Sequence, residues 1–183
     1  MRKYLCLLPL LLLTLTAQAQ ENTLATFNLK QESILRVGML VLGGWAVLNI
    51  LLASFKLTTT TRARRYFYQM NLYWNVVNLV IAGIALHHII SSDGEAMALA
   101  ESIRQHDWYK KILYLNIGLD VAYIALGAYL QQRAKTSLMK PEQLMGWGQA
   151  VVLQGFFLLL LDVVLTVMLE NISERLFRLV PLG

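Results

Sequence analysis

The feature that most constrains this chain is a series of four apolar stretches, each close to the roughly 20 residues that a helix needs to cross a bilayer core. Lipid cannot satisfy free backbone N–H and C=O groups, so the polar intervals 56–70, 91–111 and 131–145 are expected to serve as connections. The sequence therefore predicts an all-α fold, a membrane-embedded four-helix bundle. Its spans run over about residues 34–55, 72–90, 112–130 and 148–169.

The composition agrees with a membrane protein. Hydrophobic residues make up 57% of the 183 residues and charged residues only 15%, which is far too apolar for a soluble domain. The 16 Lys and Arg and the 11 Asp and Glu residues fall in clusters between apolar stretches, which excludes a disordered chain. The net charge of +5 is divided among short segments, so we expect no nucleic acid partner, which would need one basic face.

The N-terminus has the three parts of a secretory signal peptide. Two basic residues precede an apolar run over 5–15, and a small-x-small sequence ends at Ala19. The run is well short of a span, so we expect residues 1–19 to be a signal peptide that is removed. Cleavage would take Cys6, the only cysteine, and leave residues 20–183 as a single domain. Such a mature chain has no disulfide, thiolate nucleophile or Cys-ligated metal.

Basic residues set the expected orientation, because loops rich in Lys and Arg stay in the cytoplasm. The interval 91–111 balances three basic against four acidic residues, so we expect it outside. A cleaved signal peptide also places the mature N-terminus outside, and four spans return the C-terminus there. We therefore expect an N-out/C-out protein. The basic residues after the first and third spans are Lys56, Arg62, Arg64, Arg65, Arg133, Lys135 and Lys140.

Two segments outside the spans have weaker helical patterns. In the outer interval, Asp93 is placed to cap a short helix over 95–105. The tail over 171–183 has a similar mixture of apolar and charged residues. We interpret both as solvated or interfacial helices, which leaves His106 in the outer loop.

Each span carries a stripe of polar or small residues at helical spacing, and such residues in a membrane helix face the bundle. In the second span Asn71 begins the stripe, and in the first Trp45 lies on it. We expect an inner polar layer whose amides bond between helices and fix their register, or else line a path for a small polar solute. Its members are Asn49, Asn75, Asn78, Gln149 and Gln154.

A second polar layer lies in the outer half of the spans. A carboxylate inside a membrane is costly, and no Lys or Arg lies within a span to neutralise Asp120 or Asp162. We expect both at a similar depth, where they could meet. Three explanations stay open: a carboxyl is protonated, a histidine pairs with it, or the pair binds a cation. A purely structural hydrogen-bonded pair is a fourth. The outer site comprises Asp120, Asp162, Asn116, His87 and His88.

Metal and cofactor sites have little support in the sequence. His87 and His88 are adjacent, so their side chains point about 100° apart on a helix, and one is expected to face the bundle. Haem ligation needs histidines on two facing spans, so we expect no haem and no other cofactor. A divalent metal held by one histidine with Asp120 and Asp162 is chemically reasonable and stays open.

Some short sequences carry a resemblance: Tyr66-Phe67-Tyr68-Gln69-Met70-Asn71, Trp74-Asn75, Leu115-Asn116-Ile117-Gly118-Leu119-Asp120, Gly146-Trp147-Gly148 and Leu153-Gln154-Gly155. In these the chain resembles a group of small uncharacterised four-span bacterial membrane proteins. The resemblance covers most of the mature chain and implies the four-span fold. It brings with it no activity, substrate or ligand.

Two functional hypotheses follow. The first is a non-enzymatic, multi-pass protein of the bacterial inner membrane that binds or assembles through its polar core or outer surface. Its expected partners are the lipid bilayer and either copies of itself or another membrane protein. The second is a small proton- or cation-coupled transporter or channel subunit whose coupling site is the aspartate pair.

Overall fold

The computed structural model describes residues 7–60, 62–91 and 97–177, and the regular elements in these ranges are α-helices. All of them are long and apolar enough to cross a membrane, which confirms the all-α architecture and the number of apolar helices. They are α1 (Leu7–Leu57), α2 (Arg62–Ser91), α3 (Leu99–Thr136) and α4 (Pro141–Phe177).

The connections at one end of the bundle are short. Residues 58–61 join α1 to α2, and residues 137–140 join α3 to α4. Threonine hydroxyls end α1, because Thr58 Oγ1 donates to the Phe55 carbonyl at 2.8 Å and Thr60 Oγ1 donates to the Lys56 carbonyl at 2.8 Å. These bonds add to the backbone N–H of Thr60, which also donates to the Lys56 carbonyl at 3.0 Å, in satisfying the carbonyls of the last turn.

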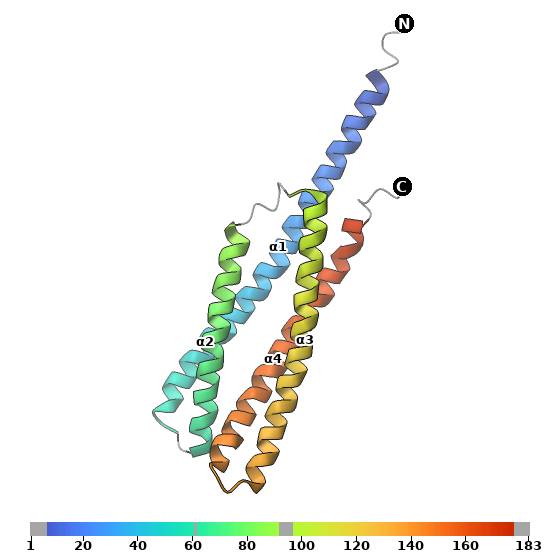
Figure 1. The fold of residues 1–183 in the computed structure, drawn as a ribbon. Helices are drawn as coiled ribbons and strands as arrows, with labels where there is room; N and C mark the ends of the chain where they lie inside the picture. Colours follow the sequence, from blue (N-terminus) through green and yellow to red (C-terminus); the bar gives the residue numbers. More distant parts are fainter. Residues whose placement is uncertain (1–6, 61, 92–96, 178–183) are drawn as a thin grey trace.

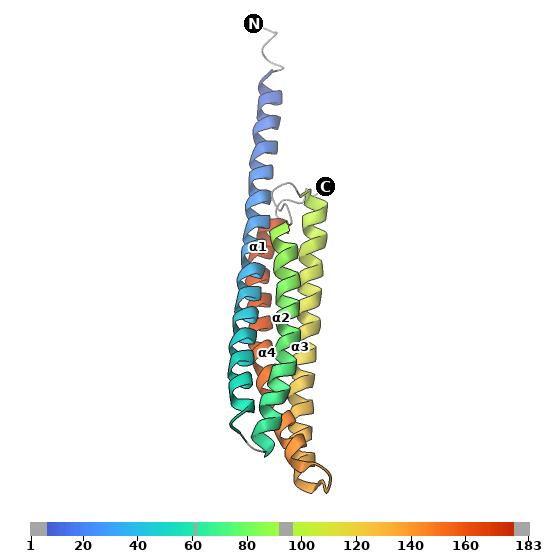
Figure 2. The same ribbon diagram turned by 90° about the vertical axis from the view of Figure 1, so that its left-hand side faces the viewer.

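The helices alternate in direction and form two layers (Figures 1 and 2). Helices α1 and α4 lie in one layer, α2 and α3 lie in the other, and the start of α1 and the end of α4 are at the same end. Helix α4 packs against all three other helices, whereas within the described ranges no Cα atom of α2 comes within 8 Å of one in α3. The layer formed by α2 and α3 is therefore open between these two helices.

The end of the bundle at which α1 begins and α4 ends is called the outer end, and the opposite end the inner end. The helices extend further at the outer end than expected from the sequence. Helix α3 begins at Leu99, so the predicted separate helix over 95–105 is wrong in its described part, which is the first turns of α3. Helix α4 continues to Phe177, and Leu176 is fully buried, so the tail up to that point is not a solvated helix. The proposed cap at Asp93 and residues 178–183 lie outside the described residues. Hydropathy along the sequence counts charged residues without regard to the helix face on which they lie. The predicted spans are therefore shorter than the helices.

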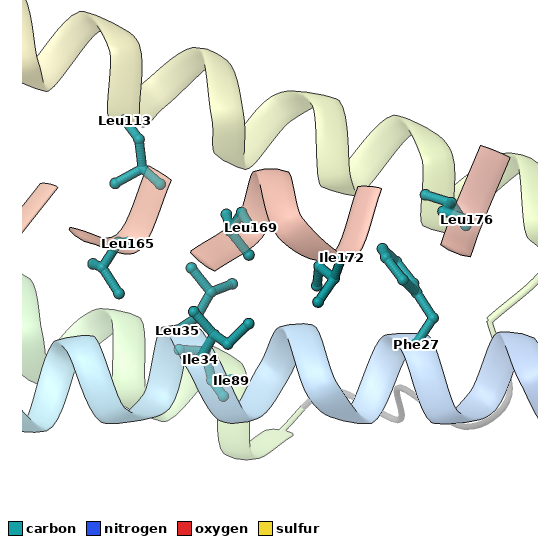
Figure 3. Packing of buried hydrophobic residues seen from close by; sticks show 9 residues of the cluster. All are labelled: Phe27, Ile34, Leu35, Ile89, Leu113, Leu165, Leu169, Ile172 and Leu176. Atoms are coloured by element: carbon teal, nitrogen blue, oxygen red, sulfur yellow. The ribbon is translucent and has the colours of Figure 1, made fainter. Parts of the chain in front are cut away.

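The apolar core lies in this outer half. Figure 3 shows Leu165, Leu169 and Ile172 on α4 facing Ile34 and Leu35 on α1. Phe27 and Ile89 also belong to the cluster and are no more than 5% exposed. The buried stripes of α1 and α4 therefore continue beyond the predicted spans, and they hold the outer ends of these helices together.

Close backbone packing joins α3 to α4 nearer the other end. A Cβ atom on Gly127 would lie 2.7 Å from the carbonyl oxygen of Gly148, and one on Gly148 would lie 2.6 Å from the carbonyl oxygen of Gly127. Gly146 packs in the same way against the backbone of Ala63 in α2. Only glycine permits these approaches, because any side chain would collide with rigid backbone atoms.

Helix α1 is continuous across Ala19, where cleavage is predicted. The structure describes the uncleaved chain, so removal of residues 1–19 stays a prediction, as does the orientation in a membrane.

Candidate functional site

The inner polar layer contains a hydrogen-bonded chain that joins three helices. The Trp45 Nε1 group of α1 donates to Gln154 Oε1 of α4 at 3.0 Å. Gln154 Nε2 donates in turn to Asn71 Oδ1 of α2 at 2.5 Å. The Trp45 ring also stacks on Phe157 with 4.1 Å between centroids. Gln154 therefore fixes the register of α1, α2 and α4, which is the structural role expected for amides in this layer.

The other predicted members of the inner layer differ in their roles. Asn75 is fully buried but bonds within its own helix, to the Asn71 carbonyl at 2.8 Å. Asn49 likewise bonds to the Trp45 carbonyl of its own helix. Gln149 is exposed, so its assignment to the layer is wrong. A separation of five residues from Gln154 turns it about 140° around α4 and away from the buried face.

The two aspartates line one groove but lie at different depths. Asp120 is 2% exposed and Asp162 is 7% exposed. The Asp120 carbonyl oxygen lies 3.1 Å from the position of a Cβ on Gly155, so Asp120 is level with Gly155 and about two turns from Asp162 along α4. The expectation of equal depth is therefore wrong. Asn116, one turn from Asp120, lies within hydrogen-bonding reach of the Asp162 carboxyl.

The two adjacent histidines do not pair with these aspartates. His87 and His88 are both exposed, and in the part of the chain that the structure describes neither forms a hydrogen bond or an ion pair. His88 lies at the outer end of the groove, while His87 does not line it. No three His, Cys, Asp or Glu side chains among the described residues are close enough together to hold a metal ion.

The groove lies between α2 and α3, with α1 and α4 as its floor, and has a volume of about 630 Å³. Its walls are mostly apolar, with Val77, Ile81 and Leu119 among the lining residues. At the inner end Trp74 and Tyr123 meet edge to face, 4.9 Å between centroids, and join the two walls. The groove thus has apolar walls, an aromatic inner end and a polar floor.

Two buried polar atoms in this groove have no hydrogen-bond partner. They are Asp120 Oδ2 and Asn78 Nδ2, and both side chains line the groove. An unpaired polar atom that is shielded from water costs about 1–3 kcal/mol. None of the described lining residues is Lys or Arg, so no basic side chain neutralises the two carboxyls. The floor therefore has polar atoms whose hydrogen bonds are not formed within the protein, and its carboxyls suit a ligand that carries a hydrogen-bond donor.

Asn78 lies opposite Asp162. Gln154 of α4 bonds to Asn71 of α2, and these two helices run in the same direction (Figure 1). Seven residues further on, Asn78 is therefore level with Leu161 and Asp162. Asn78, Asn116 and Asp162 form one polar belt across the groove, with Asp120 further inward.

A buried cluster around His106 was missed by the sequence analysis, which placed this residue in a loop. His106 is 2% exposed within α3. Its Nδ1 lies 2.6 Å from Gln31 Oε1 of α1, and its Nε2 lies 2.7 Å from Ser173 Oγ of α4. Phe27 packs against the ring with 5.3 Å between centroids. A neutral tautomer satisfies both contacts if Nδ1–H donates to Gln31 and the Ser173 hydroxyl donates to Nε2 in place of the Leu169 carbonyl, which lies 3.1 Å from the same hydroxyl.

A signal for His106 was present in the sequence. The buried residues of α3 include Leu113, Asp120, Gly127 and Ala134, which recur every seven residues, and His106 is the preceding member of the series. Residues seven apart share a helix face. Extending the stripe of Asp120 backward would have placed His106 inside the bundle.

One family model, DUF6992, described as a family of unknown function, matches residues 41–163. The matched range includes Trp45, Asn78, Asp120, Gln154 and Asp162, and it leaves out His106's partners Gln31 and Ser173. No curated protein and no solved structure matches the chain.

Proposed function

The chain belongs to the family of unknown function DUF6992, and we propose that it is a non-enzymatic integral membrane protein that binds an amphipathic ligand entering its groove from the bilayer. The observation that carries this proposal is the groove between α2 and α3. Its apolar walls match a hydrocarbon tail, and its unpaired Asp120 and Asn78 atoms match a polar head. Its volume of about 630 Å³ lies within the usual range for small-molecule sites.

The open side of the groove supports entry from lipid. Helices α2 and α3 are separated, and apolar residues such as Val76 and Leu115 are exposed on the outer surfaces of the same two helices. In a bilayer these surfaces would contact acyl chains. A lipid-soluble molecule could then pass between α2 and α3 without crossing water.

The proposed location is the inner membrane of a bacterium, with both termini outside. Both short connections lie at one end of the bundle, opposite the termini (Figure 1). They bring the basic residues Lys56, Arg62, Arg133 and Lys140 to that end. This clustering supports the cytoplasmic placement of that end under the positive-inside rule.

A photoreactive long-chain alcohol tests the proposed function. In vesicles, we expect it to label groove peptides saturably and to label the outer surfaces of α2 in direct proportion to its concentration. Ala85 lines the groove, so Ala85→Trp should abolish the saturable part. Val80 is 55% exposed and does not line it, so Val80→Trp is the matched control. Labelling that never saturates, or that is unchanged in Ala85→Trp, would overturn the proposal.

A proton- or cation-coupled transporter is the second candidate, favoured by the two carboxyls that border one groove. It predicts proton or Na⁺ movement in vesicles that carry the protein, lost in Asp120→Asn. The binding proposal predicts no such flux, with or without the substitution.

A further inference from the structure

Resting on the proposed function, we infer that the groove selects a long-chain amine, whose ammonium group binds Asp120 within the field of Asp162 and whose tail lies between α2 and α3. Both carboxyls border the same cavity, and no lining residue described by the structure is Lys or Arg. A ligand cation would supply the charge that the protein lacks.

The hydrogen-bonding needs of the floor match an ammonium group. Asp120 Oδ2 is a buried acceptor without a donor, and an ammonium has three donors and no acceptor. One donor can bind Asp120. The positive charge is also attracted by Asp162, which lies about two turns away along the groove and already has Asn116 within reach. A fatty acid would add a further carboxylate beside Asp120 and Asp162, so the floor disfavours it.

The aromatic inner end adds a second feature that favours a cation. Trp74 and Tyr123 line the groove on either side of its inner end, and Asp120 is one turn from Tyr123 on the same helix. The faces of such rings attract ammonium groups. An alkyl alcohol gains little from this arrangement, because it has no charge.

The unpaired nitrogen of Asn78 is a second polar group of the floor that a ligand could bind. Asn78 is 5% exposed and lies on α2, across the groove from both carboxyls. Its Nδ2 needs an acceptor, which an oxygen near the amine would provide. The floor as a whole therefore offers acceptors on α3 and α4 and a donor on α2.

The test is competition against the photoreactive alcohol in vesicles of zwitterionic lipid. Hexadecylamine should displace saturable groove labelling at a concentration about tenfold or more below that of hexadecanol, because a hydrogen bond to a charged group is worth about 1.5–3 kcal/mol. Palmitate should compete more weakly than hexadecanol. The vesicles are the same for each variant, so differences in partitioning cancel.

The double variant Asp120→Asn, Asp162→Asn should still be labelled saturably, which demonstrates an intact groove, but should lose the preference for the amine. Glu170→Gln is the matched control, because Glu170 lies outside the groove and pairs with Lys110 at 2.5 Å. It should keep the preference.

The failures are distinguishable. If hexadecylamine competes no better than hexadecanol on the wild type, or if the preference persists in the double variant, the inference is overturned and the groove remains a binding site. If no saturable labelling occurs at all, the proposed function itself fails.

Discussion

His106 and Asp120 lie two heptads apart on the same face of α3, and both are 2% exposed. At His106 three helices converge, and both ring nitrogens have partners, Gln31 on α1 and Ser173 on α4. At Asp120 the bundle has parted between α2 and α3, and one carboxylate oxygen has no partner. Burial alone therefore does not distinguish these two positions, whereas the state of their hydrogen bonds does.

The largest loss of stability should come from removing the His106 side chain, whose two ring nitrogens both have partners. His106→Ala removes the hydrogen bonds to Gln31 Oε1 and Ser173 Oγ, of which Ser173 keeps its bond to the Leu169 carbonyl, and opens a cavity beside Phe27. We expect a loss of about 3 kcal/mol in the free energy of unfolding. Thermal unfolding of detergent-purified protein, followed by circular dichroism, measures it.

An unchanged melting temperature in His106→Ala would contradict the structural role of this cluster. His106→Leu separates the contribution of the hydrogen bonds from that of the cavity, because leucine fills much of the cavity and removes only the hydrogen bonds.

The second prediction contrasts the closed side of α3 with its open side. Gly127→Ala places a methyl group 2.7 Å from the Gly148 carbonyl, so α3 and α4 must move apart, at a cost of about 2 kcal/mol. Gly118 on the same helix has open space around it, and Gly118→Ala should be neutral or raise stability slightly through helix propensity. Melting temperatures of the two variants provide the comparison, and equal losses would refute the close α3–α4 packing.

The smallest effect on stability should come from Asp120. Asp120→Asn leaves its shape almost unchanged and breaks no hydrogen bond at Oδ2, because that atom has none. We expect the melting temperature to stay within the range of about 0.5 kcal/mol typical of neutral substitutions, or to rise. A loss as large as that of His106→Ala would mean that Asp120 is structural, and the contrast between the two regions would disappear.

Much of the fold could be predicted from the sequence. Apolar length alone identified four helices, because a bilayer-spanning run of about 20 residues is rare in other contexts. Helix ends were less predictable, since the outer turns of α3 place charges such as Asp107 and Lys111 on an exposed face while Ser102 and His106 are buried. Hydropathy averaged over a window of the sequence combines both faces of the helix and hides this difference.

The candidate site was partly predictable for a similar reason. Helical spacing correctly placed Asn78, Asn116, Asp120 and Asp162 on inward faces, and all four line the groove. Spacing within one helix does not say which helices touch. The separation of α2 from α3, and hence the groove itself, accompanies a close approach of α4 to α3 at Gly127 and Gly148 and to α2 at Gly146, which only the three-dimensional structure reveals.

The ring contact between Trp74 and Tyr123 has a consequence for how fast the proposed ligand would enter and leave the groove. Side chains alone join the walls there, and an aromatic pair is worth only about 0.5–1.5 kcal/mol beyond its buried area. Parting the rings needs a rotation about side-chain bonds, whereas whole-helix motions take microseconds or longer. Widening of the inner end is therefore governed by a local, low-barrier movement, and residence times in the groove would be limited by the strength of the polar floor rather than by the rings.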